Sequence, residues 1–189
     1  MADQATRGAA RLAALIAVPI ALLAGLIAFW SLGGLHGARP AASASASPGP
    51  QSTAPVAMPA PSLADRPATV CRALIAQLPS QIRGLDDRPV TAGPEQNAAY
   101  GDPAITVGCG SGPMPSVAPT ADVFVLSGVC WYAQQGKDTS TWTTVDREVP
   151  VAVTVPSRYD QPAQWVIEFS GPVVASVPSI ADTPSGCRN

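Results

Sequence analysis

The stretch "VCWYAQQGKDTSTWTTVDREVPVAVTVP", Val129–Pro156, decides the fold class. The runs Val129–Gln134, Ser140–Asp146 and Glu148–Pro156 are rich in β-branched and aromatic residues and partly alternate with polar ones, a pattern typical of strands. Gly136, in the segment that joins the first two runs, favours a hairpin turn. These features predict an antiparallel sheet.

The flanking sequence adds strands and helices. Ala104–Cys109 and Ala121–Gly128 show the same extended pattern. Pro150 cannot donate a ladder hydrogen bond, so it predicts that the last run is an edge strand or contains a bulge. Asp65 and Pro67 suit a helix start, and Val70, Leu74 and Leu78 are spaced by four, which predicts a helix over Pro67–Leu78. The tail Gln161–Ile180 suits either strand or helix, and we predict two short helices there.

The predicted fold class is therefore α+β, a small domain over residues 62–189 with an antiparallel sheet and one or more packed helices. Between residues 65 and 189 there are eight Lys and Arg residues against twelve Asp and Glu residues, a net charge of −4. Nucleic-acid binding requires a basic face, so we expect no nucleic-acid partner.

Leu12–Leu32 is an uncharged apolar run of 21 residues. At about 1.5 Å per residue a helix of this length spans roughly the hydrocarbon core of a bilayer, whereas the apolar region of a cleaved signal peptide has only about 7–15 residues. "ASASA" at Ala42–Ala46 imitates a cleavage site, but it lies well past the run. We therefore predict a retained transmembrane helix over residues 12–32 that contacts the lipid bilayer.

The flanking charges set the orientation. Arg7 and Arg11 precede the apolar run, while only Arg39 and the single histidine, His36, follow closely. The positive-inside rule then places residues 1–11 in the cytoplasm and the C-terminal domain outside it. The predicted localisation is a single-pass membrane protein with an extracytoplasmic domain.

Residues 33–61 are rich in Ala, Pro and Ser and contain no aromatic residue. Such a composition cannot bury enough apolar area to offset the entropy of ordering, so it predicts a disordered linker, extended by its prolines. The alternatives are a proline-rich ligand for a partner groove and a glycosylated stalk.

All four cysteines, Cys71, Cys109, Cys130 and Cys187, lie in the predicted exported domain. In an oxidising compartment an even count predicts two disulfides, although free structural thiols are an alternative, and the sequence alone leaves three pairings open. No metal site is predicted, because there is no CxxC spacing and the histidine lies beside the apolar run. We expect no cofactor.

Catalysis has little support in the sequence. The domain has no histidine, which excludes a Ser-His-Asp triad. A carboxylate pair of the glycoside-hydrolase type remains an alternative, with Asp102, Asp146 and Glu148 as candidates by residue type. "GCGSG", 108–112, lacks the lysine of a phosphate-binding loop and predicts a loop between strands.

The aromatic residues Trp131, Tyr132 and Trp142 gather in two consecutive predicted strands. On a hairpin they are potential cross-strand neighbours, and if exposed they would form a platform for sugar rings or a protein partner, with Arg147 as a charged donor. The alternative is that both tryptophans belong to the core.

Several short motifs together resemble a family of actinobacterial membrane-anchored envelope proteins classed as domain of unknown function 3515. The resemblance covers about Val70–Pro178 and rests on the following residues: Cys71 with Leu74 and Leu78, Tyr100-Gly101-Asp102-Pro103, Cys109-Gly110, Gly128 with Trp131, and Thr143-Thr144 leading to Arg147. The family has tryptophan where this chain has Tyr100. The resemblance implies a membrane segment and an exported domain without an assigned activity, and it suggests envelope work because the genes tend to lie near those of cell-wall precursor enzymes.

The resemblance also favours one disulfide pairing, Cys71 with Cys109 and Cys130 with Cys187, because many members keep only counterparts of the first two. Our leading hypothesis is a binding or scaffolding module of the cell envelope, with an envelope protein or a cell-wall glycan as partner. Its candidate surface comprises Tyr100, Gly101, Asp102, Pro103, Trp131, Tyr132, Trp142 and Arg147. The rival hypothesis is a carboxylate-dependent envelope enzyme.

Overall fold

The computed structural model describes residues 51–118 and 121–187, together with Ile27. The chain divides into two compact units, residues 1–49 and 50–189, and the fold described below is that of the second. The segments predicted to be cytoplasmic and membrane-spanning, 1–11 and 12–32, lie outside the described residues except for Ile27. Among the described residues, no helix is long and apolar enough to cross a membrane.

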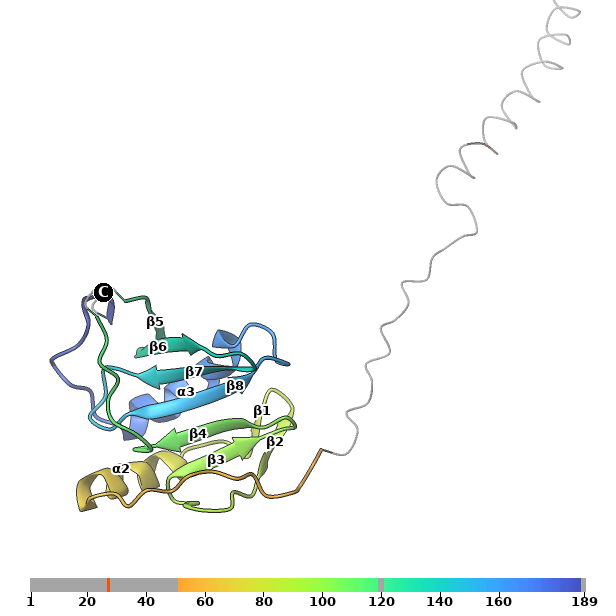
Figure 1. The fold of residues 1–189 in the computed structure, drawn as a ribbon, viewed down its shortest axis with the longest axis horizontal. Helices are drawn as coiled ribbons and strands as arrows, with labels where there is room; N and C mark the ends of the chain where they lie inside the picture. Colours follow the sequence, from red (N-terminus) through yellow and green to blue (C-terminus); the bar gives the residue numbers. More distant parts are fainter. Residues whose placement is uncertain (1–26, 28–50, 119–120, 188–189) are drawn as a thin grey trace, which may run out of the picture. The chain divides into compact units, whose positions relative to one another are not determined.

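The described part of the second unit contains an antiparallel sheet of eight strands in the order β1-β2-β3-β4-β8-β7-β6-β5 (Figure 1). The sheet and its packed helices confirm the α+β class. The strands are β1 Gln81–Ile82, β2 Leu85–Arg88, β3 Asn97–Tyr100, β4 Ile105–Cys109, β5 Val123–Leu126, β6 Val129–Gln135, β7 Thr139–Thr144 and β8 Val151–Pro156.

Two α-helices pack with this sheet, α2 (Asp65–Ile75) and α3 (Ala163–Ser176), and a short 3-10 helix, η1 (Ser185–Cys187), lies near the end of the chain. The predicted helix over Pro67–Leu78 is confirmed, although α2 begins and ends slightly earlier. The prediction of two short tail helices is wrong, because α3 is continuous with Pro172 inside it. Its buried face, Val166, Phe169, Ser170 and Val173, has continuous helical spacing, and burial of that face outweighs the hydrogen bond that Pro172 cannot make.

The core lies between the helices and one face of the sheet. Val151, Val153 and Val155 of β8 point into it and are buried. The register pairs Val153 with Val107 of β4 on one side and with Trp142 of β7 on the other, so β8 is a central strand. The edge-or-bulge prediction from Pro150 is therefore wrong. The strand begins at Val151, so the missing N–H of Pro150 falls just before the ladder.

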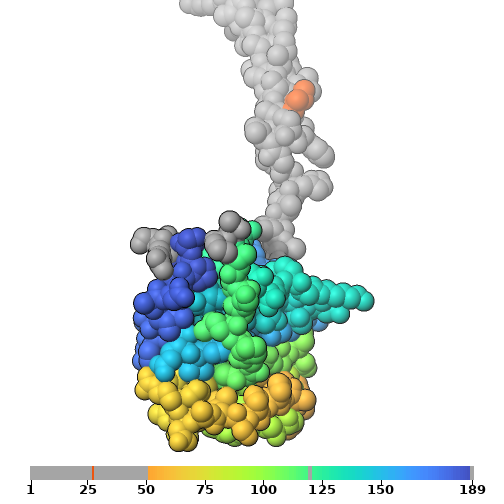
Figure 2. All heavy atoms as spheres, turned by 60° about the vertical axis from the view of Figure 1, so that its left-hand side comes forward, coloured from red at the N-terminus to blue at the C-terminus, as the bar shows by residue number. Residues whose placement is uncertain are grey.

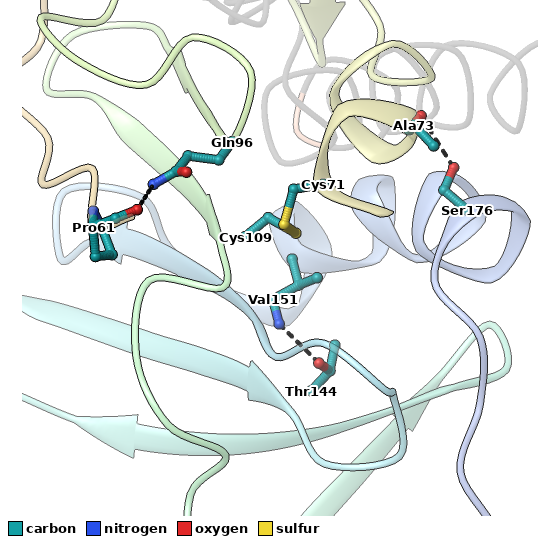
Figure 3. Close-up of a disulfide and its surroundings, with 8 residues drawn as sticks. All are labelled: Pro61, Cys71, Ala73, Gln96, Cys109, Thr144, Val151 and Ser176. Atoms are coloured by element: carbon teal, nitrogen blue, oxygen red, sulfur yellow. Dashed lines mark hydrogen bonds between the residues drawn. A yellow bond between two sulfur atoms is a disulfide. The ribbon is translucent and has the colours of Figure 1, made fainter. Parts of the chain in front are cut away.

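Both disulfides predicted from the resemblance are confirmed. Cys71 bonds Cys109 and joins α2 to β4 (Figure 3). Cys130 bonds Cys187 and joins β6 to η1. The described residues contain no free cysteine. The first bridge therefore fixes the first helix to the sheet, and the second fixes the end of the chain.

For residues 51–61, which we call the strap, the structure corrects the prediction of a disordered linker, whereas the rest of that predicted linker, 33–50, lies outside the described residues. Instead of being a free spacer, the strap packs along the domain beside β2 and β3 and reaches α2 (Figures 1 and 2, orange). Val56 forms a parallel bridge with Val90, and the Val56 N–H donates to the Pro89 carbonyl oxygen at 2.8 Å. Hydrogen bonds supply the ordering that apolar burial cannot, and composition alone does not reveal them.

Candidate binding surface

The candidate aromatic platform on β6 and β7 is not exposed, and the alternative prediction that both tryptophans belong to the core is confirmed. Trp131 and Trp142 are both buried, because their side chains point to the face of the sheet that packs with the helices. The Trp131 indole N–H donates to Ser170 Oγ of α3 at 3.2 Å, and that of Trp142 to Ser140 Oγ at 3.1 Å. Both tryptophans are thus core residues with satisfied polar atoms. Tyr132, whose side chain points to the other face, is half-buried.

Arg147 is also buried, so it is not available as a charged donor to a ligand. Its Nη2 donates to the Gly128 carbonyl oxygen in the β5–β6 turn, and its Nη1 to the Val177 carbonyl oxygen after α3. Asp146 lies beside it, with its Oδ1 3.3 Å from Arg147 Nε. Arg147 therefore fastens the segment after α3 to the β5–β6 hairpin.

The Tyr100-Gly101-Asp102-Pro103 motif divides into a buried half and an exposed half. The Tyr100 hydroxyl donates to the Pro79 carbonyl oxygen at 2.8 Å, and burial raises the pKa of Tyr100 to about 12. Gly101 is buried with φ of +70°, and an added Cβ there would lie 2.8 Å from a methyl group of Leu85. The Asp102 side chain, by contrast, is mostly exposed and lies 3.7 Å from Arg88 Nη1. The motif is thus mainly a packed turn.

The exposed half of that motif borders a second set of side chains. A shallow depression of about 370 Å³, which we call the Trp165 depression, is lined by Arg83, Arg158, Tyr159, Asp160, Gln161, Gln164 and Trp165. The β1–β2 turn supplies Arg83, the loop after β8 supplies residues 158–161, and the first turn of α3 supplies the others. The Tyr159 hydroxyl donates to the Pro103 carbonyl oxygen at 2.7 Å and so connects the depression to the motif.

Two aromatic rings and a guanidinium form the centre of the depression. The Tyr159 and Trp165 rings lie 4.9 Å apart between centroids and are tilted by 56°. Arg83 Cζ lies 5.2 Å from the centroid of the Trp165 ring, within the range of a cation–π contact. The Trp165 indole N–H is satisfied by the Asp160 carbonyl oxygen at 3.2 Å. Burial, followed by the Asp102 carboxylate, raises the pKa of Tyr159, so its hydroxyl stays protonated as a donor.

The backbone at two of these positions is unfavourable for the residues present. Arg83 and Gln161 have φ of +47° and +53°. A left-handed conformation costs a non-glycine residue about 1 kcal/mol, and a two-residue hairpin turn such as that of Arg83 usually has Asn or Gly there. The chain nevertheless places two long polar side chains at the same depression. Ser127, in the β5–β6 turn and outside the lining of the depression, has the same conformation with φ of +45°, so this conformation is not particular to the depression.

The carboxylates proposed for the enzyme alternative have separate arginine partners. Asp102 lies beside Arg88, Asp146 beside Arg147, and Glu148 accepts two hydrogen bonds from Arg66 at 2.8 and 2.9 Å. The Arg66 hydrogen bond lowers the pKa of Glu148, whereas a general acid at neutral pH needs a raised one. Within residues 51–118 and 121–187, no group of His, Cys, Asp and Glu side chains is arranged to hold a metal ion.

Arg83, Tyr159 and Trp165 were not predicted from the sequence as binding residues. The sequence contained one indication of this aromatic pair, because Trp165 precedes the apolar face of α3 and Tyr159 lies in a polar loop six residues earlier. Arg83 lies far from both aromatic residues along the chain, so the sequence did not indicate that it joins them in the depression. None of the predicted surface residues lines the depression, although Pro103 accepts the hydrogen bond from Tyr159.

A family model described as "Protein of unknown function (DUF3515)" matches residues 16–181. No curated protein and no solved structure matches the chain.

Proposed function

The chain belongs to the DUF3515 family of proteins of unknown function, and from this premise we propose that it is a membrane-anchored, extracytoplasmic binding module of the cell envelope. Two observations support the compartment. The family match begins at residue 16 and so includes most of the uncharged run Leu12–Leu32. Two disulfides also suit an oxidising compartment outside the cytoplasm.

The Trp165 depression is the proposed binding site, and a cell-wall glycan is the proposed ligand. The observation that carries this proposal is the partly exposed Tyr159–Trp165 pair surrounded by the exposed side chains of Arg158, Gln161 and Gln164. Aromatic rings supply apolar contact for the C–H faces of a sugar, while guanidinium and amide groups donate hydrogen bonds to its hydroxyl and carbonyl oxygens. The depression is shallow, as expected for a site that holds part of a long polymer.

Co-sedimentation of the purified full chain with isolated cell-wall glycan tests this proposal. Trp165→Ala should reduce the bound fraction at least fivefold, because it removes the central ring. Tyr132→Ala is the matched control, since it removes a partly exposed aromatic ring elsewhere on the sheet and should leave binding unchanged. Equal binding by wild type and Trp165→Ala would refute this site.

The same preparation separates binding from catalysis. Release of soluble sugar fragments by the wild-type chain, abolished by Asp102→Asn, would replace the binding proposal by the enzyme alternative. Intact-mass analysis of the membrane fraction tests the anchor. A mature chain that begins near Ser47 would show cleavage and contradict a retained segment over residues 12–32.

A further inference from the structure

The strap lies on the domain as a peptide ligand lies in a groove. Three side chains of the domain donate hydrogen bonds to its carbonyl oxygens. Arg88 donates from Nε and Nη2 to the Ala54 oxygen at 3.2 and 2.7 Å. Asn97 Nδ2 donates to the Pro59 oxygen at 2.9 Å. Gln96 Nε2 donates to the Pro61 oxygen at 3.2 Å, as Figure 3 shows.

Main-chain contacts fix the register of the strap in this groove. The Val56 N–H donates to the Pro89 oxygen at 2.8 Å, and the Val56 oxygen accepts from the Thr91 N–H at 2.9 Å. At the N-terminal end, the Gln51 side chain donates to the Gly84 oxygen and accepts from the Asp86 N–H. The groove therefore binds the extended main chain along nearly the whole strap.

The strap covers the donors that hold it and contributes little to the core. With the strap in place, the Arg88 side chain is exposed by only 9%, and residues Gln96 and Asn97 by 4% and 3%. Most strap residues are exposed, namely Thr53, Ala54, Pro55, Ala57, Pro59, Ala60 and Pro61. Gly93 gives Ala60 its space, because a Cβ at Gly93 would lie 2.7 Å from the Ala60 Cβ. A segment held by hydrogen bonds with little apolar burial opens more easily than the sheet.

We propose that this groove is a recognition site for extended, proline-rich segments and that it exchanges its own strap for the strap of a second copy of this chain. The occupant follows from the contacts, since the strap of a second copy offers the same carbonyl oxygens and the same Val56 bridge. Such an exchange keeps every contact of the closed form and adds only the entropy of association, which makes it a low-cost route to a dimer. Prolines reduce the cost further, because they keep the free strap extended.

A peptide titration tests the groove. The probe is a fluorescent peptide of residues 50–62, added to the full chain in detergent micelles. Val56→Pro removes the N–H that donates to Pro89, so it weakens the chain's own strap and frees the groove. We expect the peptide to bind this variant at least tenfold more tightly than wild type. Ala57→Pro, at the next and exposed position, is the matched control and should behave as wild type.

A groove substitution and a second-copy assay complete the test. Adding Gln96→Met to the Val56→Pro chain removes the donor to Pro61 and should weaken peptide binding again. Two differently tagged wild-type chains, mixed in the same micelles, should capture each other, and two Val56→Pro chains should not. Peptide binding without mutual capture would overturn the second copy as occupant and indicate a proline-rich segment of another protein.

Amide hydrogen exchange on the wild-type chain keeps the proposal testable if Val56→Pro fails to fold. The amides of Val56 and Thr91, which hold the strap, should exchange at least tenfold faster than that of Val153 in the central strand. Exchange of all three at the rate of global unfolding would mean that the strap does not open, and the proposal would fail. Absence of peptide binding to a folded Val56→Pro chain would overturn it equally.

Discussion

The two edges of the sheet differ in how they are covered. On the β1–β3 side the strap adds chain and hydrogen bonds to the outer strands. On the other side β5 ends the sheet with exposed apolar side chains, Phe124 at 44% and Val125 at 40%, and Val174 of α3 is exposed by 50%. Apart from Ile27, these three are the exposed large apolar side chains among the described residues.

The comparison shows two ways to stabilise the ends of one sheet. The covered flank relies on many hydrogen bonds from side chains and main chain. The bare flank relies on a few strong attachments, the Cys130–Cys187 bridge and the buried Arg147, which join the segment after α3 to β6 and to the β5–β6 turn. Loss of single contacts should therefore matter far more on the bare flank.

The largest effect should come from the bridge on the bare flank. Replacing both Cys130 and Cys187 by Ala should lower the free energy of unfolding by about 4 kcal/mol, because the bridge closes a loop with a sequence separation of 57. Urea unfolding of the full chain measures the loss. A change below about 1 kcal/mol would mean that the tail needs no covalent attachment.

The next largest effect should come from Arg147→Met, which should lower the free energy of unfolding by about 3 kcal/mol. It removes the donors to Gly128 and Val177 and leaves Asp146 without its neighbouring positive charge. The sequence predicted Arg147 as part of a binding surface, and the removal of an exposed side chain would leave stability nearly unchanged. Thermal melting decides between the two, with exposed Arg158→Met as the control that should melt as wild type.

Alkaline pH should weaken the covered flank through Tyr100 of β3. Its pKa is raised to about 12 in the folded chain from about 10 in the unfolded chain, so the unfolded form loses the proton first. Stability is full below pH 10 and falls as pH rises toward 12. Tyr100→Phe should be less stable at pH 8, since the bond to Pro79 is lost, but its stability should fall less between pH 9 and 11. Identical slopes would contradict this assignment.

The smallest effect on stability should come from the exposed edge itself. Val125→Lys should change the free energy of unfolding by less than about 0.5 kcal/mol, yet it should reduce concentration-dependent association, because a charge on an open edge opposes pairing with another strand. Light scattering at increasing concentration measures this. Thr53→Lys on the exposed strap is the control and should leave association unchanged.

The fold was predictable where the pattern is local. Alternation at Val151, Val153 and Val155 and the turn at Gly136 indicated the central hairpins, and the spacing of Val70 and Leu74 indicated α2. The strap was not predictable from composition, because its order depends on donors from Arg88, Gln96 and Asn97, at least 34 residues away along the chain.

The candidate site was predictable only in part. Residue type suggested aromatic and arginine side chains as the binding groups, but burial decides which of them are available. Trp131 and Arg147 face packed elements, whereas Trp165 and Arg83 remain at the surface. That difference depends on where α3 lies over the sheet, and a strand pattern contains no information about it.

The strap and the first disulfide also determine how the chain would respond to force. A pull on residue 50 acts first on the contacts of Gln51, and continued load would peel the strap before it reached the sheet. Unravelling must stop at Cys71, because the covalent bond to Cys109 transfers the load to β4. Residues 51–64, which precede α2, could therefore span up to about 50 Å, at most about 3.5 Å per residue, while the core stays folded. The strap would then detach under tension before the sheet unfolds.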